Sequence, residues 1–496
     1  MLVFLVIGII TLIFSKAATS TAVVEPENGT KSGNLSFLSS SLASGGRYLK
    51  FGQVSNCTDV VTNYAYVRPY SPSAAWNIPA CEVPRWSRSD DFSDRLWNYA
   101  TAFGNKGEWN VEFGLNTSPD DSNDYAVPVF DAADATYQAH VRPKASYNGT
   151  INIGADSTPL NDDDWLATIP FNPAWRPAQG NDGIMVIVDK VNGKEWFLWN
   201  VAWGSSLDPN SGYHPAYNNT SECQFDANNY NPRSIFFPNG RGFYDVNTDL
   251  CVAAAMITKT PTNAIADFRT YAGNLPSASG GGIQNYAGLT MAEEIEAGEI
   301  RHALKFVITN TMFGPTCPAD VTSPNDARFG TTCGSAVAPA GQFENVGILD
   351  GLRPNPNDPP LGPGSTPDER RAGSVPEGTR FALDIDNAYI ENWLNSRGYT
   401  GQKRQTAKIL ANAIRDYGLI VTDSSGGGSS IQLEGGTNPA TFQKWRNLGI
   451  NDNGKNLLFG LFTREKLYAL EPAVNICANG QSSRFFCHAS STGYPN

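Results

Sequence analysis

Two apolar segments on either side of one Asn-Gly dipeptide constrain the fold of this chain more than any other feature. Residues 184–189 are a predicted strand, and the run Lys194–Trp203 is the predicted strand that returns beside it. Asn192 and Gly193 between them are the predicted two-residue type I′ turn, because both residues tolerate a positive φ. Alternate side chains of a strand point to opposite faces, and here both faces are largely apolar. We therefore predict a central hairpin that is covered on both sides.

Further strands are predicted along most of the chain, whereas helices are few. The clearest helix is 402–417, with Thr406, Leu410, Ala413 and Tyr417 as its buried stripe and Gly418 as a left-handed stop. Asn438 followed by Pro439 predicts the start of a short helix that ends near Leu448, and 291–298 predicts one or two further turns. The other predicted strands are 126–130, 136–141, 150–153, 303–309, 380–384, 419–423 and 430–434. This pattern predicts an all-β-dominated fold, a β-sandwich of jelly-roll type with long loops and a few short helices.

The first 17 residues are a predicted export signal. The run Leu2–Phe14 is apolar but too short to span a bilayer as a helix, which needs about 20 residues. Ser15 and Ala17 then supply small residues at the −3 and −1 positions of a cleavage site. An uncleaved anchor is the alternative. Because no second apolar stretch is long enough to cross a membrane, we expect a protein secreted to the extracellular space or cell wall.

Export determines how the cysteines are interpreted. All eight lie beyond the signal, and an even number of cysteines in an oxidising compartment favours disulfides over metal ligation. None has the C-x-x-C spacing of a zinc ribbon, so no metal site is predicted. Connectivity is not determined by sequence, but local pairing closes the shortest loops. The local pairs are Cys57–Cys81, Cys223–Cys251, Cys317–Cys333 and Cys477–Cys487.

Composition along the chain suggests one large domain with two appendages. Residues 18–45 are rich in Ser, Thr and Gly and are a predicted flexible leader. Residues 46–474 are a predicted single β-sandwich domain with insertions, and 475–496 a tail stapled by its two cysteines. Potential N-glycosylation sites are Asn28, Asn34, Asn56, Asn116, Asn148, Asn218 and Asn219.

Charge and missing motifs exclude several classes of function. The formal net charge is −12, and an acidic surface repels phosphate backbones, so nucleic acid is a poor partner. The chain lacks G-x-S-x-G, H-E-x-x-H, a P-loop and a dinucleotide fingerprint. We expect no cofactor. The loop 120–124 has oxygen ligands at alternate positions, as a calcium loop would, but lacks the following Gly and the distal Glu.

Four stretches resemble, in the same order, a group of secreted and largely uncharacterised proteins of actinobacteria and some fungi. They are 183–196, 297–306, 378–383 and 407–423. This chain departs from the usual pattern of the group at Gly183-Ile184, where a His is usual, and after Asp423, where Asn-Gly is usual. The resemblance implies a secreted protein of jelly-roll fold. It also implies that the acidic pair Glu293-Glu294 stands at the usual offset before His302.

Three residues are candidates for catalysis. His302, one of four histidines, is in phase with the inward side chains of the predicted strand 303–309 and is either a core histidine or a general acid or base. Glu294 is either its carboxylate partner or a helix-start acid that the helix dipole stabilises. Asp423 ends a strand before a glycine-rich turn, so it is either a turn residue or a second carboxylate beside His302.

The tryptophans of the hairpin, Trp199 and Trp203, are candidate platforms for sugar rings, although most tryptophans at such density belong to the core. Two carboxylates on either side of a sugar bond are the arrangement of a glycosidase, and a His with a Tyr or Arg suits a polysaccharide lyase. Our leading hypothesis is a secreted carbohydrate-active protein that cleaves an extracellular polysaccharide. The alternative is a non-catalytic glycan-binding or structural protein of the cell wall or extracellular matrix.

Overall fold

The computed structural model divides the chain into two units, Met1–Asp59 and Val60–Asn496, which we describe separately. In the first unit it describes residues 35–39 and 47–51. In the second it describes most of 74–99, 126–143, 168–201, 279–340 and 373–476, with shorter stretches between and after them.

The first unit contains a hairpin of β1 (Leu35–Ser39) and β2 (Arg47–Phe51), paired antiparallel with Phe37 opposite Leu49. β1 lies within residues 18–45, for which a flexible leader was predicted, and the boundary between the two units falls after Asp59. The division into leader, domain and tail stays a prediction.

Three sheets of three or more strands are described in the second unit. Their strand orders are β16-β13-β14-β12-β15-β3, β4-β8-β9-β11-β6 and β10-β5-β7. A further two-stranded pair, β17 with β18, lies in the predicted C-terminal tail. The strands are β3 (Asn110–Glu112), β4 (Val129–Asp131), β5 (Tyr137–Pro143), β6 (Ile151–Ile153), β7 (Thr168–Phe171), β8 (Met185–Asp189), β9 (Lys194–Trp199), β10 (Asp249–Val252), β11 (Ala254–Lys259), β12 (Leu304–Ile308), β13 (Arg380–Leu383), β14 (Leu419–Ser424), β15 (Ser430–Gln432), β16 (Leu467–Ala469), β17 (Asn475–Ile476) and β18 (Ser482–Ser483).

The predicted hairpin is confirmed in its strands and faces. β8 and β9 pair antiparallel and lie inside the five-stranded sheet. Phe197 packs in one apolar cluster and Trp196 and Leu198 pack in another, so both faces are buried as expected. The described strand pairs of this hairpin end with Asp189 opposite Lys194. The turn residues Asn192 and Gly193 themselves lie outside the described residues.

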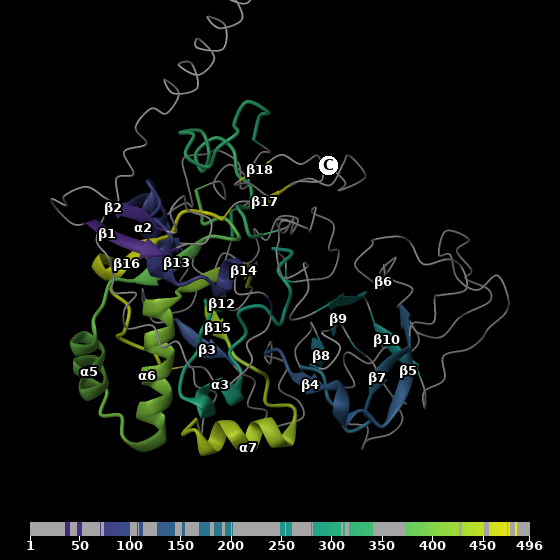
Figure 1. Ribbon diagram of the computed structural model, residues 1–496. Coiled ribbons are helices and arrows are strands. Elements are labelled where there is room, and N and C mark those ends of the chain that lie inside the picture. Colours follow the sequence, from purple (N-terminus) through teal and green to yellow (C-terminus); the bar gives the residue numbers. More distant parts are fainter. Residues whose placement is uncertain are drawn as a thin grey trace, which may run out of the picture. The chain divides into compact units, whose positions relative to one another are not determined.

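The helices follow local signals that the sequence carries. α6 (Gly401–Asp416) and α7 (Pro439–Asn447) confirm two predictions, and Asn438 caps α7 by accepting a hydrogen bond from Ala440 N at 3.0 Å. α3 (Ala292–Ala297) confirms the predicted short helix. Two helices, α2 (Ser89–Tyr99) and α5 (Asn387–Ser396), were not predicted. Figure 1 shows α5 and α6 side by side, next to the six-stranded sheet.

The buried clusters show how the layers of this unit are stacked. One face of the six-stranded sheet, with Leu304 and Phe306 of β12, packs with apolar residues of α2, α5, α6 and α7. Its other face, with Ala303 and Ile420, packs with Val186 and Phe197 of the five-stranded sheet. The far face of the five-stranded sheet packs with residues of β5 and β7. A helical layer and three sheets therefore follow one another.

Several strand pairs are parallel, including β12 with β14 and β4 with β8. The described part of the chain combines these parallel pairs with antiparallel pairs and helices. The all-β jelly-roll class stays a prediction. Within the part of the chain that the structure describes, no helix is long and apolar enough to cross a membrane.

Candidate functional site

His302 and Glu294 lie together, as the sequence suggested. Nε2 of His302 is 3.0 Å from Oε1 and 3.1 Å from Oε2 of Glu294, and its Nδ1 is 3.0 Å from the carbonyl oxygen of Ala303. Only 2% of His302 and none of Glu294 is exposed. The pair is thus sealed in the interior, immediately before β12.

The partners of this pair determine where its protons lie. A carbonyl oxygen can only accept a hydrogen bond, so Nδ1 of His302 carries a proton. Nε2 faces the carboxyl group of Glu294 within hydrogen-bonding distance. Glu294 also accepts a hydrogen bond from Met291 N at 3.0 Å, which closes the first turn of α3. The arrangement fixes a short helix against a strand, as a structural His–Glu pair does.

Asp423 does not join this pair. β12 and β14 run parallel, with Leu304 opposite Leu419 and Val307 opposite Asp423. His302 precedes the start of β12, so Asp423 lies about five residues further along the sheet, or roughly 16 Å at about 3.3 Å per residue. The proposed convergence of three titratable groups in one groove is therefore absent for these three residues.

Asp423 instead lies near a buried lysine that the sequence analysis did not single out. Lys305 is 1% exposed, although it belongs to an otherwise apolar strand, and its Nζ donates a hydrogen bond to Oδ1 of Asn285. Burial lowers the pKa of Lys305 to about 8, against the attraction of Asp423 and Glu195, which favours the charged form. A charge within a run such as Leu-Lys-Phe-Val-Ile is the signal that could have identified it.

The second carboxylate of this cluster belongs to the central hairpin. Glu195 of β9 is fully buried, and it accepts hydrogen bonds from the hydroxyl group of Tyr70 and, at 3.3 Å, from Tyr286 N. We call Lys305, Asn285, Glu195, Asp423 and Tyr70 the lysine cluster. It lies between the six-stranded and five-stranded sheets and draws on segments that are far apart in the sequence.

A glycine-rich segment, 279–291, builds one wall of the lysine cluster. It is fastened to two neighbouring strands, because Gly281 N donates to the Thr422 carbonyl at 2.9 Å and Lys305 N donates to the Gly288 carbonyl at 2.7 Å. Gly288 has a φ of 70°, and a Cβ there would stand 2.7 Å from the Ala303 carbonyl oxygen, so only glycine fits. This anchoring places Asn285 against Lys305.

The two predicted sugar platforms have different outcomes. Trp199 is partly exposed and packs against the same apolar cluster that surrounds the lysine cluster. It shares the face of β9 with Glu195 and Phe197, as the alternation predicted. Trp203 lies outside the described residues. Trp199 therefore stays a candidate platform.

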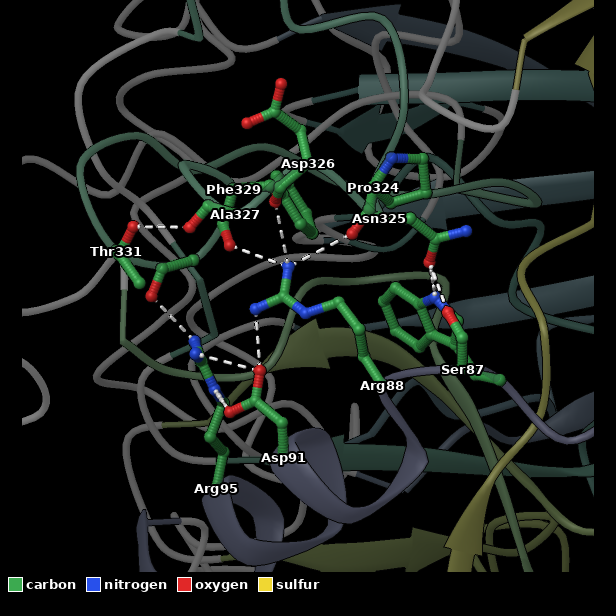
Figure 2. Close-up of polar contacts among 12 residues, drawn as sticks. Ser87, Arg88, Asp91, Arg95, Pro324, Asn325, Asp326, Ala327, Phe329 and Thr331 are labelled. Carbon is green, nitrogen blue, oxygen red and sulfur yellow. Dashed lines mark hydrogen bonds and ion pairs between the residues drawn. The ribbon is translucent and has the colours of Figure 1, made fainter.

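A second polar network fastens the loop 318–333 to α2 (Figure 2). Arg88 Nη1 donates to the carbonyl oxygens of Phe329 at 2.7 Å and Pro324 at 3.0 Å, and Arg95 Nη1 donates to Gly330 at 2.8 Å. Asp91 joins both guanidinium groups. These contacts satisfy loop carbonyls, and their chemistry is structural.

The buried carboxyl group of Glu434 accepts a hydrogen bond from the backbone at the start of α3. Burial raises the pKa of Glu434 to about 7, although hydrogen bonds from Ala292 N and the Thr441 hydroxyl, at 3.0 and 3.1 Å, favour its charged form.

Within the described part of the chain, no group of three or more His, Cys, Asp or Glu residues could hold a metal ion.

The local disulfide Cys317–Cys333 is confirmed. Cys81 is also disulfide-bonded. The remaining cysteine side chains lie outside the described residues, as does the loop 120–124. So do all seven predicted glycosylation sites: Asn28, Asn34, Asn56, Asn116, Asn148, Asn218 and Asn219.

Comparisons of this chain with known protein families, with curated proteins and with solved structures found no match.

Proposed function

We propose that this is a secreted carbohydrate-active protein that binds an extracellular polysaccharide and does not cleave it through His302 and Glu294. The observation that carries this proposal is the burial of the His302–Glu294 pair. Glu294 accepts a hydrogen bond at the start of α3, and His302 lies immediately before β12. A catalytic acid or base must reach its substrate, and only 2% of His302 and none of Glu294 is exposed.

Secretion is supported by the cysteines. The Cys317–Cys333 bond and the bonded state of Cys81 fit an oxidising compartment, because disulfides are rare in reducing ones. Binding is supported by Trp199, whose partly exposed ring is a face on which a sugar ring stacks. The resemblance to secreted proteins of actinobacteria and fungi agrees with this location.

Retention on insoluble polysaccharides tests the binding proposal. The secreted full-length protein is passed over crystalline cellulose, chitin, β-1,3-glucan and cross-linked pectin, and the bound fraction is measured. We expect retention on at least one of them, reduced at least tenfold by Trp199→Ala. Phe442→Ala, which removes a partly exposed aromatic ring from α7, is the matched control and leaves retention unchanged. Absence of retention on all four, or equal loss in both variants, would contradict the proposal.

Cleavage of the polysaccharide is the second candidate, and one observation favours it. Asp423 is partly exposed, and it acts electrostatically on Lys305 together with Glu195. Glycoside hydrolysis needs a carboxylate that reaches the scissile bond, and Asp423 has exposed surface, unlike the fully buried Glu195. In this candidate, Asp423 takes the role that the sequence analysis gave to it, without His302.

Product analysis separates the two candidates. Hydrolysis releases new reducing ends, whereas elimination releases an unsaturated sugar with ultraviolet absorbance. Cleavage predicts that one of these products accumulates and that Asp423→Asn abolishes it, while Asp416→Asn, which alters an acid at the end of α6, does not. Retention without either product supports binding alone.

A further inference from the structure

The contact between Lys305 and Asn285 joins two side chains that lie 20 residues apart in the sequence. The two residues are 1% and 2% exposed, and Nζ of the lysine touches the amide oxygen of the asparagine. The amide nitrogen, Nδ2 of Asn285, is buried and has no hydrogen-bond partner among the described residues. A buried amide whose oxygen accepts a hydrogen bond while its nitrogen donates none needs a physical explanation.

The surroundings of Lys305 favour a reactive amine. Desolvation opposes the ammonium form, and with a pKa of about 8 roughly one molecule in ten carries the neutral amine at pH 7. The neutral amine is the nucleophilic form of lysine. Two carboxylates, Asp423 and Glu195, act electrostatically on the same side chain.

We propose that Lys305 and Asn285 form an intramolecular isopeptide bond in the folded protein. Nζ of Lys305 attacks Cγ of Asn285, and a new C–N bond forms while the bond between Cγ and Nδ2 breaks. The Asp423 and Glu195 carboxylates take a proton from Nζ and deliver one to Nδ2, which leaves as ammonia. The reaction consumes no oxidant, reductant or second substrate, and it neutralises the buried charge of Lys305.

The product would tie the glycine-rich wall 279–291 to the central strand β12. That wall already contacts β12 through Gly288 and β9 through Tyr286, so the covalent bond closes a cross-link between layers that pack on each other. Such a bond suits a protein that works outside the cell, where proteases act and no chaperones refold the chain. This inference goes beyond the proposed function and does not depend on it.

Mass spectrometry of the secreted full-length protein tests the proposal. After reduction and removal of N-glycans, we expect an intact mass lower than that of the mature sequence by one ammonia molecule, with each deglycosylated Asn counted as Asp. Trypsin cleaves after Arg269, Arg301 and Arg328, so the cross-link predicts one branched peptide in which 270–301 is joined to 302–328, uncut at Lys305. The branched peptide separates this bond from a succinimide at Asn192-Gly193, which also loses ammonia.

Variants identify the participants. Lys305→Arg and Asn285→Ala abolish the branched peptide, whereas Asn285→Asp forms the same product with loss of water and so reaches the wild-type mass. Gln284→Ala, at the adjacent buried position, retains the branched peptide and is the matched control. Separate peptides with unmodified Asn285 and Lys305 in the folded wild-type protein would overturn the proposal. A branched peptide that persists in the double variant Asp423→Asn, Glu195→Gln would overturn the role of the carboxylates.

Discussion

The glycine that ends α6 links the helical layer to the strand that carries Lys305, and its replacement by alanine tests that link. Gly418 has a φ of 90°, and its carbonyl oxygen accepts a hydrogen bond from Leu304 N at 2.8 Å. A Cβ at this position would stand 2.1 Å from the carbonyl oxygen of Phe381. Real Cβ atoms do not approach other atoms closer than 3.0 Å, so the backbone of β13 or β14 must move.

Gly398, which follows α5, is the matched control for this substitution. It has a φ of 65°, but no atom lies within 4 Å of the Cβ that alanine would add. The left-handed conformation costs an L-residue roughly 1–2 kcal/mol, and this cost applies to both glycines. Overpacking of a closed site adds about 1–3 kcal/mol at Gly418 alone. We therefore expect a loss of about 1–2 kcal/mol for Gly398→Ala and about 2–5 kcal/mol for Gly418→Ala.

Thermal unfolding of the two variants measures this difference. For a domain of 150–250 residues, 1 kcal/mol corresponds to about 2–4 °C in Tm, and the shift is smaller for a larger unit. The fall in Tm should be at least twofold greater for Gly418→Ala than for Gly398→Ala. Equal shifts would refute the reasoning, because they would show that the close approach to Phe381 does not constrain the site.

Three further outcomes follow from the buried groups. His302→Gln leaves the buried carboxyl group of Glu294 with a weaker partner. We therefore expect a loss of roughly 2–4 kcal/mol in the free energy of unfolding, measured by denaturant titration, and unchanged retention on polysaccharide. Unchanged stability would show that the pair is not structural. Glu434 binds its proton more tightly in the folded state, because its pKa is raised from 4.5 to about 7. Its contribution to the free energy of unfolding is therefore fully present below pH 4.5. This contribution falls by up to about 3 kcal/mol as the pH rises to 7. Glu434→Gln should flatten the dependence of Tm on pH in that range, and an unaltered profile would show that another group dominates. Reduction of Cys317–Cys333, or its replacement by two serines, should lower the free energy of unfolding by about 3 kcal/mol, because the bond closes a loop of 16 residues. The folded wild-type protein should show no thiol that reacts with an alkylating agent.

Much of the local structure was predictable from the sequence. The stripe of α6, the cap of α7 at Asn438 and the two faces of the β8–β9 hairpin depend on periodicity and capping within about a dozen residues, and the structure has all three. The contact of His302 with Glu294 spans only eight residues and was also within reach. The Cys317–Cys333 pair was predicted because it closes a short loop.

The lysine cluster was not predictable in the same way. Glu195 meets Tyr70 across 125 residues and Tyr286 across 91, so these partners depend on which strands become neighbours. The parallel pairing of β12 with β14 separated Asp423 from His302 and brought it within reach of Lys305. Strand order is decided by how whole faces bury one another, a property of the assembled layers that no single segment carries. The sequence by itself determined α3, α6 and α7, the hairpin faces and one disulfide, whereas only the tertiary structure decided which side chains meet in the lysine cluster.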